Sequence, residues 1–367
     1  YPGFSWTPDG KNIIITAKGG FWNVTVTNTN IKAIPFIAAV EQEITKPFTI
    51  KNKVGGDDFD VKVVRHTRVS PNGKKVVFNA LGKLYLANAD GSGRKRLTKQ
   101  HNGLEYAPAW SPDGKQIAFT TWSDKQKGRL AVISANGGKP KFMNVSAGHY
   151  FNPSWSADGS QLAYRRGGGS WIRGRDNSAK TGIYTIKVKG GKPKLVTKDG
   201  SEPRFTSGDS RILLLGYEKK NGALYSVDMN GQGRRVLATS KYANRIMLSP
   251  NEDWVLFDHR FHVYAAPFSK IGKAIHLGPK TASVPVKQLT AGSGFEPHWS
   301  DNNSIHWTLG SELYGVDLKD AFTFVPGAPD SLPDPAESGT NLGWTTSAPA
   351  PKGLVAITGA TIITMDG

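Results

Sequence analysis

Short apolar runs follow one another along most of the chain, and clusters of Gly, Pro, Asp, Asn and Ser separate them. Residues 129–134 read Arg-Leu-Ala-Val-Ile-Ser, a continuous apolar run between two polar residues, which is typical of a β-strand packed on both faces. Residues 116–121 and 83–88 have the same character. The pattern therefore predicts an all-β protein with a tight turn between most neighbouring strands.

One unit of this pattern recurs. Its clearest copy reads Ala-Pro-Ala-Trp-Ser-Pro-Asp-Gly at residues 107–114, where a strand ends on an aromatic residue, a tight turn follows, and an apolar strand begins. Proline presets the φ of such a turn, aspartate hydrogen-bonds to its own backbone, and glycine accepts a positive φ. Aligned on the residue before the turn, the copies fall at Trp6, Val69, Trp110, Trp155, Phe205, Leu248 and Trp299.

Repetition at about 40 to 50 residues, with four short strands in each unit, is typical of a β-propeller. We therefore expect a seven-bladed, all-β propeller of four-stranded antiparallel blades, in which the recurring aromatic residues pack between blades. The last repeat has a candidate fourth strand near residues 322–325. Because each terminal repeat then has its own four strands, the ring should close by blade packing, without a strand exchanged between the chain ends. The alternative is a six-bladed ring with one degenerate repeat outside it.

Three stretches depart from the regular plan. Residues 38–60 lengthen the first repeat and are expected to form an insertion over one face. Residues 326–352 are rich in proline, as extended linkers are. Residues 353–367 contain two short apolar runs. The expected organisation is a propeller at 1–325, a Pro-rich linker at 326–352, and the first strands of a further, truncated domain at 353–367.

Composition excludes several classes of site but does not by itself indicate a function. Lys and Arg outnumber Asp and Glu by 47 to 29, and the net charge is +18. This excess permits an acidic partner, but the basic residues are spread over every repeat, as on an ordinary solvated surface, so nucleic acid is not expected. The absence of cysteine excludes disulfides, thiolate zinc sites and a cysteine nucleophile. No apolar run is long enough for a membrane span.

The familiar motifs of catalysis are missing. The sequence contains no Gly-x-Ser-x-Gly, Walker loop, dinucleotide fingerprint or His-Glu-x-x-His. His259 and His262 are the nearest approach to a metal pair, but on one strand this spacing would place their rings on opposite faces. We expect no catalytic residue and no metal ligand in this segment.

The repeat itself predicts one polar site. Three residues before each aligned aromatic residue, the chain should enter the innermost strand at the mouth of the central channel. Candidate ligand contacts at or beside these positions are His66, Arg68, Asn152, Glu202, Arg204, Arg245, Glu296 and His298. Such a ring of side chains could hold a peptide end or a small polar ligand; alternatively, the charges pair with one another and with water. The steps from Glu202 and from Glu296 into proline are expected to be extended, because a residue before proline avoids the α region.

A second candidate is the loop at residues 165–175, where arginines flank three adjacent glycines. A loop of this composition could hold a polyanion or a carboxylate; alternatively, it is a solvated loop whose tryptophan covers its own blade. Its candidate partner residues are Arg165, Arg166, Trp171, Arg173 and Arg175.

The turn signature, with Leu-Tyr or Ile-Tyr in the third strand and Leu-Thr or Val-Thr closing the blade, resembles the TolB-type propeller repeat as far as Val325. Residues 279–281, 312–322 and 353–367 resemble the junction between propeller and catalytic domain in large bacterial amidohydrolases. In that family a propeller region precedes a small β-sandwich and a metal-dependent barrel whose metal site begins with His-x-His. This chain contains no His-x-His, so none of the family's catalytic residues can be carried over.

The resemblance implies a non-catalytic propeller region of a TolB-like amidohydrolase, acting as docking scaffold and substrate filter for a metal-dependent hydrolase domain of the same protein. A divalent metal such as zinc is then expected only in that domain, and no cofactor in this segment. A periplasmic or secreted location is also implied; no signal peptide is visible, and the chain begins inside the first repeat, as an excised or processed segment would. Two other functions stay open: a TolB-like module that binds a protein or peptide, and a basic propeller that binds a polyanion.

Overall fold

The computed structural model describes residues 3–45, 56, 58–99, 103–168, 180–270, 272–348 and 356–361. Within these ranges the chain is all-β, apart from one 3-10 turn at Leu318–Asp320. It divides into two compact units, Tyr1–Gly55 and Gly56–Gly367. No helix in these ranges is long and apolar enough to cross a membrane.

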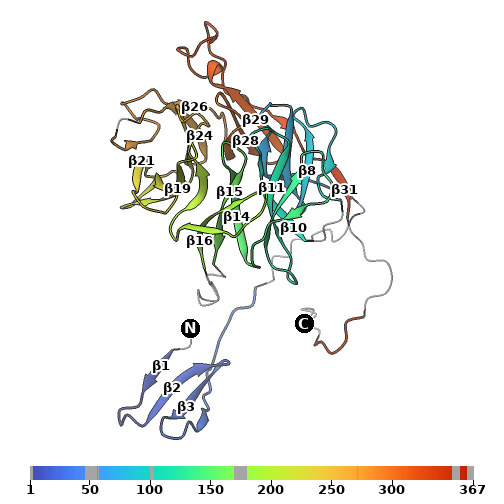
Figure 1. The fold of residues 1–367 in the computed structure, drawn as a ribbon. Helices are drawn as coiled ribbons and strands as arrows, with labels where there is room; N and C mark the ends of the chain where they lie inside the picture. The colour runs from blue at the N-terminus through green and yellow to red at the C-terminus, as the bar shows by residue number, and fades with distance from the viewer. Residues whose placement is uncertain are drawn as a thin grey trace. The chain divides into compact units, whose positions relative to one another are not determined.

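The first unit contains one antiparallel sheet with its strands in chain order (Figure 1). The strands are β1 (Phe4–Trp6), β2 (Asn12–Ala17), β3 (Gly20–Thr25) and β4 (Ile31–Ile34). Trp6, at the aligned aromatic position, is 53% exposed, whereas Trp155 at the same position of a later repeat is 9% exposed. The first repeat therefore forms its predicted strands without the two-sided packing of a blade.

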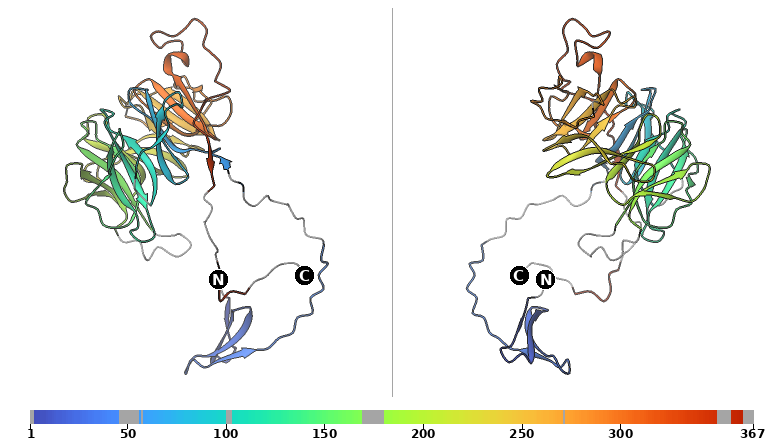
Figure 2. Two further views of the ribbon diagram at one scale, coloured as in Figure 1. Left: turned by 90° about the vertical axis from the view of Figure 1, so that its right-hand side faces the viewer. Right: turned by 60° about the vertical axis from the view of Figure 1, so that its left-hand side comes forward.

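The second unit contains six four-stranded antiparallel blades, arranged in chain order around a centre (Figures 1 and 2). Blade 1 consists of β6 (Arg65–Val69), β7 (Lys75–Ala80), β8 (Lys83–Asn88) and β9 (Lys95–Arg96). Blade 2 consists of β10 (Leu104–Trp110), β11 (Gln116–Trp122), β12 (Arg129–Ser134) and β13 (Lys141–Phe142). Blade 3 consists of β14 (His149–Trp155), β15 (Gln161–Gly167), β16 (Gly182–Lys187) and β17 (Lys194–Thr197).

The second half of the ring follows the same plan. Blade 4 consists of β18 (Ser201–Phe205), β19 (Arg211–Glu218), β20 (Asn221–Asp228) and β21 (Arg235–Ser240), with β25 (Ile275–His276) added in parallel. Blade 5 consists of β22 (Ile246–Leu248), β23 (Trp254–His259), β24 (His262–Pro267) and β26 (Lys287–Gln288). Blade 6 consists of β27 (Phe295–Trp299), β28 (Ser304–Leu309), β29 (Glu312–Asp317) and β30 (Thr340–Asn341).

Six apolar cores, one between each pair of neighbouring blades, hold the ring together. The core that joins the two ends of the ring packs Leu313 and Leu342 of blade 6 against Val76 and Phe78 of blade 1. Because these two blades pack directly on each other, the expectation of seven blades is corrected to six, in agreement with the alternative. Burial of apolar side chains on both faces of each sheet is the main source of this stability.

The end of the ring differs from the sequence expectation in two ways. The fourth strand of blade 6 is β30, from the stretch expected to be a linker, whereas residues 322–325 form turns and Phe322 packs beside Trp254. In addition, β31 (Thr345–Ser347) pairs with β5 (Asp58–Asp60), which lies in the expected insertion. The first and last strands of the second unit therefore pair in a small sheet, so the expectation that the ring closes by blade packing alone is corrected. Of the predicted strands at 353–367, the structure describes only 356–361, and these residues form no strand.

The two faces of the ring differ in their turns. In blade 2, Leu104 at the start of β10 pairs with Trp122 at the end of β11, whereas Trp110 pairs with Ile117 beside the Ser-Pro-Asp-Gly turn. We call the face where innermost strands begin the mouth face, and the face with the Ser-Pro-Asp-Gly turns the turn face. On the turn face Asp113 accepts hydrogen bonds from its own turn, as the sequence predicts.

Turns that depart from Ser-Pro-Asp-Gly bond to the blade before them. Asp209 and Glu252 occupy the glycine position, with positive φ of 54° and 63°. Asp209 accepts the N–H groups of Ala157 and Asp158 at 2.7 and 3.2 Å, and Glu252 accepts that of Ser207 at 2.6 Å. Ala157 and Ser207 stand where the turns of blades 1, 2 and 5 have proline, so each has an N–H that proline would lack. The departures in neighbouring turns therefore compensate each other.

Candidate functional site

A bulge marks the channel end of the innermost strands. The pairing of the first and second strands shifts register in five of the six blades. The extra residues, all with φ between 47° and 53°, are His66, Ala107, Asn152, Glu202 and Glu296. These are the positions that the repeat predicted for the channel mouth. A bulge re-aims the side chains next to it, and it often lies beside a functional site.

The conformation of the two Glu-Pro steps is a correction. An extended backbone was expected before Pro203 and Pro297, but Glu202 and Glu296 have φ of 47° and 53°. The bulge places an extra residue in the strand, and the left-handed conformation of that residue overrides the preference that proline imposes.

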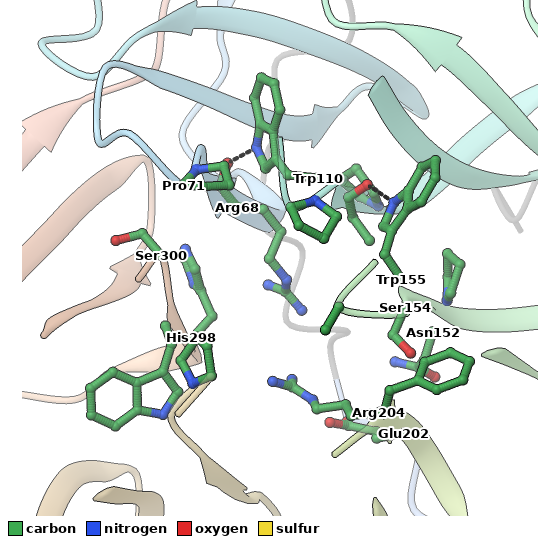
Figure 3. A pocket seen from close by; sticks show the side chains of 18 of the residues that line it. Arg68, Pro71, Trp110, Asn152, Ser154, Trp155, Glu202, Arg204, His298 and Ser300 are labelled. Carbon is green, nitrogen blue, oxygen red and sulfur yellow. Dashed lines mark hydrogen bonds between the residues drawn. The ribbon is translucent and has the colours of Figure 1, made fainter. Parts of the chain in front are cut away.

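A cavity of about 460 Å³ extends along the channel from the bulges to the turn face (Figure 3). Six of the predicted contacts line it: His66, Arg68, Asn152, Glu202, Arg204 and His298. Arg245 and Glu296 are not among the lining residues. The rest of the lining is mixed: Trp110 and Trp155 provide apolar surface, and Asp301 and Asn302 add polar groups. A cavity of this size, with apolar surface and convergent polar groups, is typical of a ligand site.

Two guanidinium groups dominate the charge in the cavity. Arg68 projects from blade 1 and Arg204 from blade 4, and both point into the open space (Figure 3). Burial lowers the pKa of Arg68 to about 10, and it also lowers the pKa of Arg204. Because a guanidinium group is not deprotonated in proteins at neutral pH, both side chains are cationic, in a setting that favours a bound anion.

One ion pair and one carboxylate–histidine contact join neighbouring blades at the other charged residues. Glu202 of blade 4 lies 3.5 Å from Nε of Arg245 in blade 5, and Glu296 of blade 6 lies 3.6 Å from Nδ1 of His66 in blade 1. Burial lowers the pKa of His66 despite the nearby Glu296 carboxylate. Nη1 of Arg245 and Oε2 of Glu296 are buried without a hydrogen-bond partner in the described part of the chain.

His298 lines the cavity, but its ring nitrogens bind to the protein backbone and are not free for a ligand. Its Nε2 accepts the N–H of Val69 in blade 1 at 3.1 Å, which leaves the proton on Nδ1 to be donated to the carbonyl of Glu296 at 3.1 Å. Burial and the nearby Arg68 hold the pKa of His298 well below its usual range. Both ring nitrogens are occupied, so His298 joins the first and last blades.

Tryptophan indoles make similar links between blades. Nε1 of Trp110 donates to the carbonyl of Arg68 at 2.9 Å, and Nε1 of Trp155 donates to the carbonyl of Ala109 at 3.0 Å. In both cases the acceptor is the residue before the aligned position of the preceding blade. The repeated aromatic residues therefore set the spacing of the arginines and neighbouring groups that face the channel.

The other candidates do not join this site. Arg166 donates to Ser146 at 2.9 Å and Arg165 lies 5.8 Å from the ring of Phe151, while Trp171, Arg173 and Arg175 are outside the described residues. His259 and His262 are paired across the hairpin of β23 and β24. The expectation of opposite faces was therefore wrong, because a turn separates the two histidines. His262 is within hydrogen-bond distance of Thr290, at 3.2 Å.

Histidine burial predicts how stability depends on pH. The pKa of His66, His298 and His306 is lowered from 6.5 by burial, that of His306 to about 4. Below pH 6.5 the unfolded chain binds protons that the folded ring does not, so the free energy of unfolding should be constant near pH 7.5 and fall as the pH decreases from 6.5 toward 4. Urea unfolding at a series of pH values measures this. A stability that increases over this interval would contradict it.

The family model of the TolB beta propeller domain matches residues 62–265, more than half of the chain. The chain belongs to this family. The match begins in the second unit, and it reaches into blade 5 of the TolB-type propeller.

Two curated relatives match short parts of this TolB-type propeller. Dipeptidyl-peptidase 5 of Porphyromonas gingivalis is 42% identical over 66 residues, which cover 15% of this chain and 10% of the relative. The protein of that name from Porphyromonas endodontalis is 35% identical over 75 residues, which cover 18% of this chain and 11% of the relative. The matches thus span about a tenth of the length of these relatives.

A solved structure supports the fold. TolB from Acinetobacter baumannii has a TM-score of 0.50 and 14% identity to this chain, over 94% of this chain and 81% of that one. At this level of identity the similarity extends to the propeller architecture alone. The TolB family and the all-β, four-stranded blades of the sequence expectation are therefore confirmed.

Proposed function

We propose that this TolB-type propeller is the binding region of a larger metal-dependent amidohydrolase. It docks against the hydrolase domain of that protein and admits substrate through its channel, while a divalent metal such as zinc belongs to the hydrolase domain. The location is periplasmic or secreted. The observation that carries this proposal is the cavity along the ring axis, where Arg68 and Arg204 face open space.

The mouth face supports the docking role. Large apolar side chains that are more than a third exposed gather there: Val63, Leu81, Leu104, Tyr217, Tyr242, Phe261, Phe295 and Leu309. Phe261 and Phe295, 62% and 48% exposed, lie with ring centroids 6.1 Å apart. Exposed apolar side chains grouped on one face favour a protein interface.

Backbone strain on the same face supports this role further. Leu81, Lys219, Arg260 and Phe261 have φ of 51°, 55°, 48° and 72° in hairpins between second and third strands. Glycine or asparagine normally takes such positions, and a bulky residue there costs about 1 kcal/mol or more. Strained residues that present apolar and cationic side chains are typical of functional surfaces.

Addition of two negative charges to the mouth face tests the docking role. The double variant Phe261→Glu with Phe295→Glu should bind the hydrolase domain at least about tenfold more weakly than the parent, because it buries two carboxylates at the interface. Biolayer interferometry with the separately produced hydrolase domain measures this. Lys115→Glu is the matched control, since Lys115 lies on the turn face with its side chain 82% exposed.

Two results would reject the proposal. One is equal binding of the hydrolase domain by the double variant and by the control. The other is amide hydrolysis by residues 1–367 alone in the presence of a metal chelator.

A second candidate function, a peptide- or protein-binding module without an attached hydrolase, uses the same cavity. Reversal of both Glu202 and Glu296 to lysine should then abolish capture of a partner and the biological function together. In the amidohydrolase region, the same change would alter substrate selection and leave docking through the mouth face intact.

A further inference from the structure

Two arginines in the channel have capacity for a ligand that the protein does not use. The side chain of Arg204 makes no hydrogen bond, and no ion pair within 4 Å, with any residue that the structure describes. The side chain of Arg68 makes one hydrogen bond, from Nη1 to the carbonyl of Thr67 at 2.6 Å. Both are at least half-buried and face the cavity from blades 1 and 4, which lie opposite each other in a six-bladed ring (Figure 3). Desolvated guanidinium donors without acceptors are costly, and a bound anion would supply those acceptors.

The charges of the channel favour a monoanion over a dianion. Arg68, Arg204 and Arg245 share the channel with three carboxylates: Glu202 and Glu296, which contact Arg245 and His66 of neighbouring blades, and Asp301, which lines the cavity. Burial keeps the two histidines of the site neutral near pH 7. A bound carboxylate adds one negative charge between the guanidinium groups of Arg68 and Arg204, whereas a phosphate dianion would add two to a channel that already holds three carboxylates.

The remaining walls indicate what is attached to that carboxylate. The side chain of Asn152 lines the cavity and has no hydrogen-bond partner among the described residues. Its amide can both donate and accept, as a peptide group requires. Trp110 and Trp155 provide apolar surface elsewhere in the lining. This combination suits the last residues of a peptide chain.

We infer that Arg68 and Arg204 bind the terminal carboxylate of a peptide in the channel, with Asn152 beside its last peptide bond. The inference deepens the proposed function, since it names the substrate class that the channel selects: peptides with a free carboxyl end. A planar guanidinium fork matches a carboxylate in two parallel hydrogen bonds, which gives the site its preference for this group.

Calorimetry with matched peptides tests the site in the whole 367-residue chain. The probes are N-acetyl-Ala-Ala-Ala as free acid, the same peptide as C-terminal amide, and inorganic phosphate. We expect the free acid to bind at least about thirtyfold more tightly than the amide, because the amide removes the charge-assisted bonds. Phosphate should bind more weakly than the free acid. Equal affinity for acid and amide, tighter binding of phosphate, or no binding of the acid at millimolar concentration would overturn the inference.

Variants separate this role from a structural one. Arg204→Gln should lose at least about tenfold in affinity for the free acid, and Arg204→Lys should lie between, because it keeps the charge without the fork. Lys115→Gln on the turn face is the control and should bind as the parent does. The unfolding midpoint of Arg204→Gln should be unchanged or higher, since the substitution removes a desolvated cation. Unchanged peptide affinity, or a clear loss of stability, would show a structural arginine and overturn the inference.

The outcome is independent of docking. Peptide binding by a chain that does not dock to a hydrolase domain would support the carboxylate site and reject the proposed function. Docking to the hydrolase domain without any preference for the free acid would support the proposed function and reject the carboxylate site.

Discussion

Replacement of His298 by alanine is expected to destabilise the ring by about 3 kcal/mol, as the sum of an unsatisfied buried N–H and a cavity. The histidine is 2% exposed, and its two nitrogens link Val69 of the first blade to Glu296 of the last. Its loss removes the hydrogen bond between the first and last blades, where the ring closes. Urea unfolding at pH 7.5 measures the change in the free energy of unfolding.

Two further variants serve as controls for His298→Ala. His298→Gln can place an amide oxygen where Nε2 accepts the Val69 N–H, so it should recover part of the loss. His262→Ala, which removes a half-buried histidine next to Thr290, should cost less than about 1 kcal/mol. If His298→Ala behaves like His262→Ala, the link between the first and last blades does not contribute to closure.

Replacement of Glu252 by glycine is expected to destabilise the protein by about 2 kcal/mol, although glycine is the residue of the repeat at this position. Glycine relieves the backbone strain of a φ of 63° and contributes about 1 kcal/mol in the opposite direction. The buried carboxylate, however, accepts the N–H of Ser207 at 2.6 Å and pairs with Lys270. Loss of these partners outweighs the relief, because the Ser207 N–H keeps no acceptor. The unfolding midpoint in urea measures the difference.

A double variant tests the proposed compensation. Ser207→Pro removes the N–H that Glu252 satisfies, so Ser207→Pro with Glu252→Gly should be more stable than the sum of the single changes by about 1 kcal/mol. Asp209→Gly, at the more exposed equivalent in blade 4, should cost less than Glu252→Gly, because water can reach the freed N–H groups. Additive effects of the two changes in the double variant would refute the compensation.

The bulges show which features of the channel can be predicted from the local sequence and which cannot. The alignment of seven turns placed the channel mouth three residues before each aromatic residue, and in five blades these residues are the bulge. The periodicity identified them because turn, strand and aromatic residue lie within a few positions of each other. Their backbone conformation was missed at Glu202 and Glu296, because the preference of a residue before proline is weaker than the register of a paired strand.

The turns with altered sequence show a different limit. At Asp209 and Glu252 the signature looked degraded, yet each side chain bonds to the preceding blade. The signal was present, since Ala157 and Ser207 replace the proline that most of the turns have. This signal could be interpreted only once neighbouring blades were known to be adjacent. The residue that lacks proline and the acidic residue that accepts its N–H are about 50 residues apart in the sequence, one repeat from each other.

The sequence by itself determined the family, the strands of each repeat, the tight turns and the set of charged residues at the channel, since all depend on short-range patterns and on repetition. The tertiary structure alone decided the number of blades, the origin of the last strand at Thr340–Asn341, and which charges pair. These depend on contacts between distant parts of the chain: blade 6 can pack on blade 1, and Glu202 and Glu296 engage Arg245 and His66 of adjacent blades. Arg68 and Arg204 are left facing open space for the same reason, because their nearest carboxylates are engaged with neighbouring blades.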